Sequence, residues 1–325
     1  MKKQLLLLTK FAVTVGLLVH IGRRIEWTEL IHLFTLADGI FILAAILFSV
    51  LNLLLSNLRW HSLIRCTPRS SVRFWELMDL SVVGLFFNTC LPGGIAGDLI
   101  RGHRAKQYQL KSREAYGSVI VDRLLGLIGL ITVAILGFTM NWTDTTGFRW
   151  QFPLFCVYIV GVVSYFSLVN PTVSNWVLRR FNPKNDLIEK GLRLYKTVAS
   201  YPSSGHYWVS LIATLLTGGL LVATMFCLSQ AFGSAIPYGV LLWLVPTVGI
   251  LSTIPISLNG WGIREAGYIF FLELVGVSTT HALALSMSFG ALALLLGGLG
   301  GLWYGFSTLF PQFLHPVRDL PPSQV

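Results

Sequence analysis

The fold is decided by an interruption in an apolar part of the chain, Leu91-Pro92-Gly93-Gly94-Ile95-Ala96-Gly97-Asp98-Leu99-Ile100-Arg101. The apolar stretch around it runs from Met78 to about Arg101. Proline removes a backbone donor and clashes with the preceding helical turn, and glycine adds backbone freedom. We therefore expect two half-helices here rather than one continuous helix.

A second interruption has the same character, Ile254-Pro255-Ile256-Ser257-Leu258-Asn259-Gly260-Trp261-Gly262-Ile263-Arg264-Glu265. It splits the apolar stretch that runs from Val240 to about Gly276. A proline, then glycines, then charged residues follow in the same order in both interruptions. The residues expected to break the helices are Pro92, Gly93, Gly94, Gly97, Pro255, Gly260 and Gly262.

The composition places most of the chain in a membrane. Of 325 residues, 54% are hydrophobic and 12% are charged, whereas soluble domains carry about 25% charged residues. The net charge of +10 would suggest nucleic-acid binding in a soluble protein. Here the basic residues lie in short loops beside apolar spans, which predicts contact with anionic head groups at the cytoplasmic face and no nucleic-acid partner. The scattered cysteines and histidines show no ligand spacing, so we expect no metal and no cofactor.

The remaining apolar stretches predict about six full transmembrane helices, at 5–21, 39–58, 114–140, 150–170, 206–232 and 280–310. No convincing cleavage site follows the first, so an uncleaved span is expected. With a cytoplasmic N-terminus and two re-entrant hairpins, nineteen of the 24 basic residues fall on the cytoplasmic side. This positive-inside bias predicts a multi-pass protein of the inner (cytoplasmic) membrane with both termini in the cytoplasm.

The order of these elements predicts an internal repeat. Residues 1–145 give span, span, hairpin (about 78–106) and span, and residues 146–325 give the same order with a hairpin at about 240–276. The second half also carries a basic cytoplasmic loop at about 171–205. Because the halves start on opposite sides, the hairpins are expected to enter from opposite faces. The predicted fold class is an all-α integral membrane protein with an inverted-topology repeat and two opposed broken-helix hairpins.

Charged residues inside apolar segments are the candidate functional residues, because a charge at the bilayer centre is costly. Asp98 and Arg101 are three residues apart and share one helix face. Arg264 and Glu265 follow the second interruption, and we expect Arg264 to meet Asp98, Asp122 or a lipid phosphate. Further candidate site residues are Asp122, Arg123, Asn88, Asn259 and Trp261.

Each of these residues also has a structural explanation. Asp98 could be an acidic residue in the first turn of a helix, and Arg101 could lie at the membrane interface. Arg264 and Glu265 could balance one another and lock the hairpins. Asp122 is expected to pair with a base such as Arg101 or Arg264, and Asn88 could satisfy backbone groups freed by the break.

Three ordered blocks resemble the signature of a known family. They are Asn88 to Asp98 with Arg101, then Asp122-Arg123-Leu124-Leu125-Gly126-Leu127, then Ile254-Pro255 through Gly260, Gly262, Arg264 and Glu265. The family is the lysylphosphatidylglycerol synthase transmembrane-domain family, also called the flippase-like or UPF0104 family. The resemblance implies that the protein handles lipids. In its best-known relatives this region is joined to a soluble aminoacyl-transferase domain. The resemblance covers the membrane region and we expect no such domain here, so aminoacylation is not carried over.

The sequence favours a lipid transporter that is not an enzyme, with a membrane lipid as its substrate. The lipid would carry a polar, phosphate-containing head group that is aminoacylated, glycosylated or polyprenyl-linked. Two alternatives stay open: a membrane-embedded glycosyl or lipid transferase, and an accessory subunit of a cytoplasmic lipid synthase. The sequence also leaves open whether several copies form a homo-oligomer.

Overall fold

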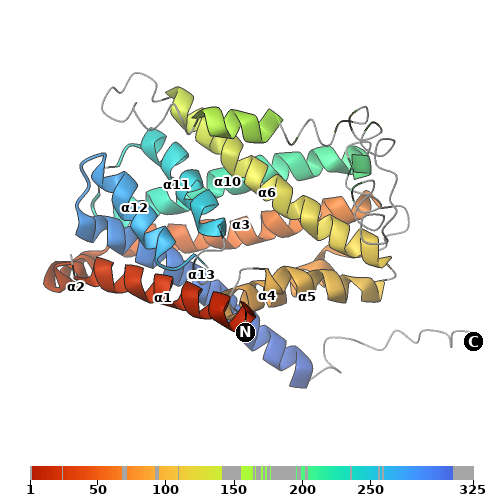
Figure 1. Ribbon diagram of the computed structural model, residues 1–325, viewed down its shortest axis with the longest axis horizontal. Coiled ribbons are helices and arrows are strands. Elements are labelled where there is room, and N and C mark those ends of the chain that lie inside the picture. Colours follow the sequence, from red (N-terminus) through yellow and green to blue (C-terminus); the bar gives the residue numbers. More distant parts are fainter. Residues whose placement is uncertain are drawn as a thin grey trace, which may run out of the picture.

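A computed structural model shows the arrangement of the helices (Figure 1). It describes residues 2–23, 25–67, 72–91, 95–108, 110–140, 155–163, 204–234, 236–254 and 260–309, with residues 165, 170, 173, 176, 195, 199–201 and 257. Within these residues the regular structure is helical, with one short 3₁₀ turn at Lys106–Tyr108 and no strand. The all-α prediction is therefore confirmed for the described part of the chain.

Four helices are long and apolar enough to cross a membrane: α3 (Gly39–Arg65), α6 (Ser112–Met140), α10 (Gly205–Ala231) and α13 (Thr279–Leu309). At 1.5 Å per residue, the shortest of them is about 40 Å long, which exceeds the apolar thickness of a bilayer. They correspond to four of the six predicted spans.

The two other predicted spans are not seen as full-length spans in the described residues. The stretch 5–21 lies in α1 (Lys2–Gly22), whose described apolar part, Phe11–Gly22, is shorter than a full span. Of the stretch 150–170, residues 155–163 are helical and most of the others lie outside the described residues. The number of six full spans thus stays a prediction.

Both interrupted stretches form pairs of antiparallel helices. In the first pair, α4 (Phe74–Cys90) runs to the break and α5 (Ala96–Ala105) returns beside it, since Gly84 contacts both Gly97 and Arg101. In the second pair, α11 (Tyr238–Thr253) and α12 (Ile263–Glu273) are related in the same way, with Gly267 against Val248. The break residues Pro92, Gly93, Gly94, Pro255 and Asn259 lie outside the described residues.

The two halves of the chain are interleaved. The most extensive helix contact joins α3 to α10, and each helix pair packs on the last long helix of the other half: α4 on α13, and α11 on α6. The contact of α5 with α6 likewise has a counterpart in that of α12 with α13. A two-fold relation between the halves would produce this reciprocal packing, although the inverted repeat and the boundary near residue 145 remain predictions.

Small residues allow the close approach of α13 to α4. A side chain added at Gly297 would come within 2.6 Å of the Thr89 hydroxyl, and one added at Gly301 would come within 2.6 Å of the Phe86 ring. Lipid acyl chains are as apolar as the helix surface, so little free energy is gained by removing that surface from lipid. Close van der Waals packing is therefore a main source of helix association in a membrane. This contact fixes α4, and therefore the first break, against the second half of the chain.

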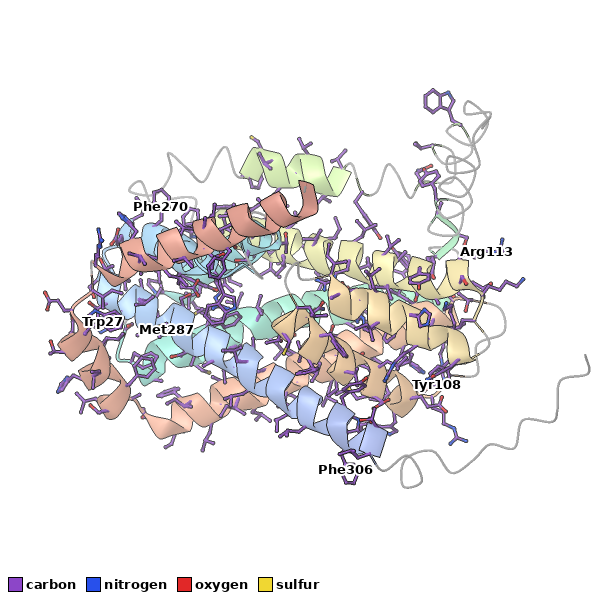
Figure 2. The ribbon with its side chains drawn as sticks, turned by 60° about the horizontal axis from the view of Figure 1, so that its bottom comes forward. Trp27, Tyr108, Arg113, Phe270, Met287 and Phe306 are labelled. Carbon is purple, nitrogen blue, oxygen red and sulfur yellow. The ribbon has the colours of Figure 1, made fainter. Side chains whose placement is uncertain are left out.

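The outer surface is apolar along the length of the bundle. Figure 2 shows Phe270 on α12 and Phe306 on α13 at the edge of the molecule, and Trp27 on α2 (Trp27–Leu36) at one end; Met287 on α13 is exposed as well. Tyr108 and Arg113 lie together at the opposite end of the molecule from Trp27. An exposed apolar surface of this extent is expected for helices that face lipid acyl chains.

Candidate functional site

A cavity of ≈ 830 Å³ lies beside the first break and is lined by both halves of the chain. The first half contributes residues of α3, α4, α5 and α6, among them Arg59, Asp98, Arg101, Asp122 and Arg123. The second half contributes residues of α10 and of the segment around the second break: Thr217, Gly218, Leu221, Ser252, Thr253, Ile254, Ser257 and Gly260. The two breaks therefore line the same space.

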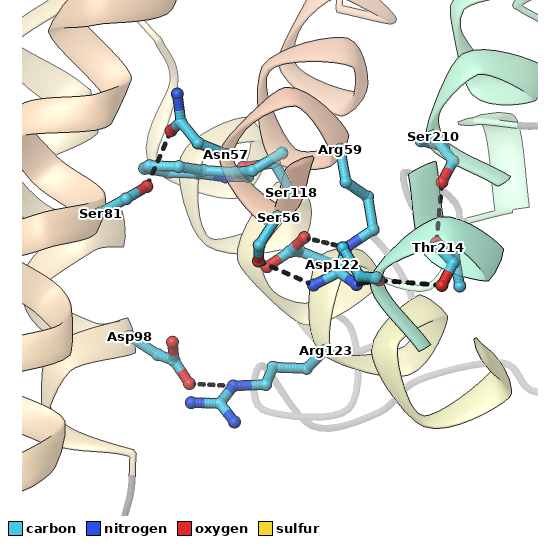
Figure 3. Close-up of polar contacts among 12 residues, drawn as sticks. Ser56, Asn57, Arg59, Ser81, Asp98, Ser118, Asp122, Arg123, Ser210 and Thr214 are labelled. Atoms are coloured by element: carbon cyan, nitrogen blue, oxygen red, sulfur yellow. Dashed lines mark hydrogen bonds and ion pairs between the residues drawn. The ribbon is translucent and has the colours of Figure 1, made fainter. Parts of the chain in front are cut away.

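Asp122 lies at the buried centre of the charged cluster. Its Oδ1 accepts a hydrogen bond from Arg59 Nε at 2.7 Å, and its Oδ2 accepts one from Arg101 Nη2 at 3.0 Å. Arg59 also donates to the Ser56 hydroxyl at 3.3 Å, as Figure 3 shows. Asp122 is only 2% exposed, so its charge needs these guanidinium partners to be tolerated away from water.

Asp98 occupies the first turn of α5 and also has two guanidinium partners. Arg101 Nη2 lies 3.1 Å from its Oδ1, and Arg123 Nε donates to its Oδ2 (Figure 3). Arg101 thus lies between the two aspartates and shares one nitrogen with both. The side chain of Arg123 is 49% exposed, whereas that of Asp98 is 8% exposed. Asp98 and Arg101 share one face of α5, as expected from their spacing, and they also form an ion pair there.

The Arg101 guanidinium group also packs against an aromatic ring. The Arg101 guanidinium carbon lies 4.6 Å from the centre of the Trp60 ring, which is a cation–π distance. Trp60 is held in turn by the hydrogen bond from its Nε1 to the Ser118 hydroxyl at 3.0 Å. The guanidinium plane is therefore fixed by packing as well as by charge.

The approach of α5 to α4 depends on Gly97 and Asn88. Asn88 Oδ1 accepts a hydrogen bond from the Gly97 N–H at 2.8 Å, which confirms that Asn88 satisfies a backbone group freed by the break. A side chain at Gly97 would collide with the backbone of Gly84. This close contact places Asp98, the next residue, inside the cavity.

The second charged pair is arranged differently from the expectation. Arg264 does not meet Asp98 or Asp122 in the structure; its Nη2 donates to Glu265 Oε1 at 2.6 Å and its Nε does so at 3.0 Å. Adjacent residues on a helix point about 100° apart, but the long arginine side chain bends back toward the neighbouring carboxylate. Arg264 also stacks on Trp261, with 4.5 Å between its guanidinium carbon and the ring centre.

Glu265 caps the N-terminal end of α12. Its Oε2 accepts a hydrogen bond from the Gly262 N–H at 2.6 Å, and Gly262 has a φ of +82°, a conformation that favours glycine. The Ser286 hydroxyl on α13 lies 3.4 Å from Oε1. Glu265 is 1% exposed and is held both by the backbone of Gly262 and by Arg264, whose charge balances its own. This geometry agrees with the locking role of the pair and does not place it in the cavity.

Two residues of the site were not expected from the sequence. Arg59 was counted among the basic residues of the cytoplasmic side because it follows the predicted span 39–58, but it lies within α3 and pairs with Asp122. Its presence inside a long apolar helix was the available signal. Ser257 lines the cavity, and nothing in its local sequence distinguishes it from other small polar residues. Among the residues that the structure describes, no three His, Cys, Asp or Glu side chains come close enough to hold a metal ion.

Comparison with known proteins identifies the family. Residues 7–301 match the family described as the lysylphosphatidylglycerol synthase TM region. The chain belongs to this family. It is 24% identical to a UPF0104 membrane protein of Methanothermobacter thermautotrophicus over 281 residues, which cover 76% of this chain and 79% of that protein. It is 31% identical to a UPF0104 membrane protein of Pyrococcus horikoshii over 145 residues, which cover 42% of this chain and 41% of that protein.

Membership of this family identifies the general type of protein. The match spans both breaks and every charged residue described above. The chain is thus a multi-pass membrane protein of a family named for a lipid synthase. The stretch shared with the Pyrococcus horikoshii protein spans less than half of that relative.

Proposed function

We propose that this protein moves a lipid with a polar head group between the two leaflets of the membrane. The observation that carries the proposal is the composition of the cavity wall. The cavity is lined both by buried charged residues and by exposed apolar side chains, namely Ile95, Leu99, Ile120, Leu124 and Ile254. A lipid has the same division, since its head group requires polar contacts while its acyl chains remain in the bilayer.

The charged cluster could exchange partners as a head group passes. Arg101 is already shared between Asp98 and Asp122 at nearly equal distances, 3.1 Å and 3.0 Å. A phosphate could replace one carboxylate because a guanidinium offers a planar fork of donors that suits both groups. Such an exchange would keep each buried charge paired at every stage of the transfer.

The membrane arrangement belongs to the same proposal. In this proposal the helix pairs α4–α5 and α11–α12 are re-entrant hairpins that enter the membrane from opposite faces. The protein lies in the inner (cytoplasmic) membrane, and both of its termini are in the cytoplasm. The family match and the four long apolar helices support a multi-pass placement. The positive-inside bias of the loops supports the orientation.

Lipid transfer by purified protein in proteoliposomes tests this function. Fluorescent lipids in the inner leaflet become accessible to a membrane-impermeant quencher only after they have crossed. We expect transfer by the wild-type protein and slower transfer by Asp98→Ala and Arg101→Ala. Arg104→Ala is the matched control, because Arg104 lies on the same helix but outside the cavity and stacks on Tyr304 instead. Absence of wild-type transfer with every lipid tried would refute the function, and unchanged transfer in both cavity variants would refute the site.

A further inference from the structure

Two helices meet at the cavity with the same spacing of apolar and charged residues. Each has an isoleucine, a charged residue three positions later and a leucine directly after it. At the start of α5 these are Ile95, Asp98 and Leu99, and on α6 they are Ile120, Arg123 and Leu124. Residues three and four positions apart share a helix face, and all six residues line the cavity. Each helix therefore presents two large apolar side chains and one charged side chain to the same space.

The apolar residues of these two faces are exposed beside a buried charge. Asp98 is buried, whereas the next residue, Leu99, is 58% exposed. The other three apolar side chains are exposed as well, those of Ile95, Ile120 and Leu124. The cavity therefore reaches the outer surface between α5 and α6. These four apolar residues form its rim, which we call the α5–α6 opening.

The ion pair of Asp98 with Arg123 crosses the α5–α6 opening and joins the two helices (Figure 3). The aspartate side chain is buried and the arginine side chain is half-exposed, so the pair runs from the interior of the cavity to the outside. Asp98 also has Arg101 at 3.1 Å. Movement of Arg123 away from Asp98 would therefore leave the buried carboxylate with a guanidinium partner.

The position of the opening along α6 favours contact with acyl chains. Ile120 and Leu124 lie about 12 and 18 Å from the first residue of this helix, which is about 43 Å long. The apolar core of a bilayer is about 30 Å thick. In a helix that crosses the bilayer, both residues therefore lie within the apolar core rather than at the membrane surface.

We propose that a lipid enters the cavity sideways through the α5–α6 opening. Its acyl chains lie against the four apolar residues of the opening, and its head group passes the ion pair of Asp98 with Arg123. The proposal rests on the proposed function and adds the route of entry. A protein helix packed on the same residues would cover the mouth of the cavity and bury the half-exposed Arg123. A lipid matches both the charged interior and the apolar rim.

Polar substitutions at the opening test the acyl-chain contact without requiring transport. Binding of phosphatidylglycerol and phosphatidylethanolamine to the purified full-length protein in detergent is measured by native mass spectrometry. We expect Leu99→Asn and Leu124→Asn to bind about tenfold more weakly than the wild type, because an amide against an acyl chain has no hydrogen-bond partner. The matched control is Leu216→Asn, since Leu216 is 51% exposed on α10 but does not line the cavity. Wild-type binding in both rim variants, equal weakening by the control, or no lipid bound to the wild type would overturn the proposal.

A cross-link across the opening tests the route itself. Cysteines replace Leu99 and Leu124 in a variant without the four native cysteines, and a cleavable bis-maleimide joins them. We expect lipid transfer in proteoliposomes to stop when the linker is in place and to return when it is cleaved. The two single-cysteine variants, treated with the same reagent, control for the bulk of the label. Full transfer in the cross-linked protein would overturn the lateral route.

The ion pair across the opening should slow the passage of lipid. Arg123→Gln should speed the exchange of bound lipid for isotope-labelled lipid by about two- to fivefold, the range that a partly exposed ion pair provides. Native mass spectrometry over time measures this exchange. Arg104→Gln, on α5 but outside the cavity, should leave the exchange rate unchanged. Equal or slower exchange in Arg123→Gln would overturn the role of the ion pair as a gate.

Failure of this inference can be separated from failure of the proposed function. Transfer that continues while the opening is cross-linked would leave transport intact and refute the route. Weaker lipid binding in Leu99→Asn and Leu124→Asn alone, with no transfer of any lipid by the wild type, would leave the acyl-chain surface intact and refute transport.

Discussion

The buried pair Arg59–Asp122 provides the sharpest test of how the site is built. Asp122→Leu would remove the carboxylate that neutralises Arg59 at 2.7 Å and Arg101 at 3.0 Å. Arg101 would keep Asp98, but Arg59 would keep only Ser56 at 3.3 Å and a marginal contact with Thr217 at 3.5 Å. Breaking a buried pair by removing one partner costs about 3–5 kcal/mol. We therefore expect the free energy of unfolding to fall by about that amount.

Removing both partners should cost less than removing Asp122 alone. The double variant Arg59→Met/Asp122→Leu takes away one positive and one negative charge together, so the net charge of the cluster is unchanged. Replacement of a buried ion pair by apolar residues of similar volume is often neutral or stabilising. The double variant should therefore recover about 2 kcal/mol or more of what Asp122→Leu loses.

Denaturant unfolding of the purified variants, followed by tryptophan fluorescence, measures these differences. A matched control combines Arg59→Met with Glu265→Gln, because Glu265 pairs with Arg264 and shares no partner with Arg59, so the two effects should simply add. If the losses of Arg59→Met and Asp122→Leu also add in the double variant, the two side chains do not neutralise each other and the cluster described here is incorrect.

Three other outcomes follow from individual contacts. Gly97→Ala should lower the free energy of unfolding by about 1–3 kcal/mol, since the added carbon collides with the backbone of Gly84; denaturant unfolding checks this against Gly16→Ala, where nothing lies nearby. Glu265→Gln should destabilise the protein by leaving Arg264, whose side chain is only 15% exposed, without its counter-charge, and denaturant unfolding measures the loss. Burial raises the pKa of the Cys66 thiol, so its thiolate forms at higher pH than usual. In a variant whose other cysteines are replaced, maleimide modification of Cys66 should rise with pH around a higher midpoint in the folded protein than in the denatured protein, and an equal or lower midpoint would contradict the burial.

Much of the architecture follows from local chemistry that the sequence displays. The apolar runs of α3, α6, α10 and α13 are long enough to predict helices, and proline with glycine is sufficient to predict a break at each interrupted stretch. That Asp98 and Arg101 share one helix face follows from their spacing. Each of these features depends on residues that lie close together in the chain, so it can be predicted without knowing how distant segments pack.

The partners of the remaining charges depend on how distant helices meet. Arg59 and Asp122 lie 63 residues apart, and only the packing of α3 beside α6 brings them together. Several acidic residues were likewise possible partners of Arg264 on the basis of sequence. In the structure its side chain bends toward Glu265 and pairs with that residue. Ser257 became part of the cavity because the second break lies beside the first, which no local pattern reveals.

The two breaks carry similar sequences but have different chemical properties. At the first, three arginines share two aspartates, Arg123 is half-exposed, and Arg101 keeps a buried donor without a partner in the described structure. At the second, Arg264 and Glu265 neutralise each other, and the carboxylate also caps Gly262. A ligand can gain interactions at the first cluster, whereas at the second it would have to break existing ones. The first half of the chain therefore offers a ligand the Nε of Arg101, while the second half supplies a fixed helix start and the hydroxyl of Ser257.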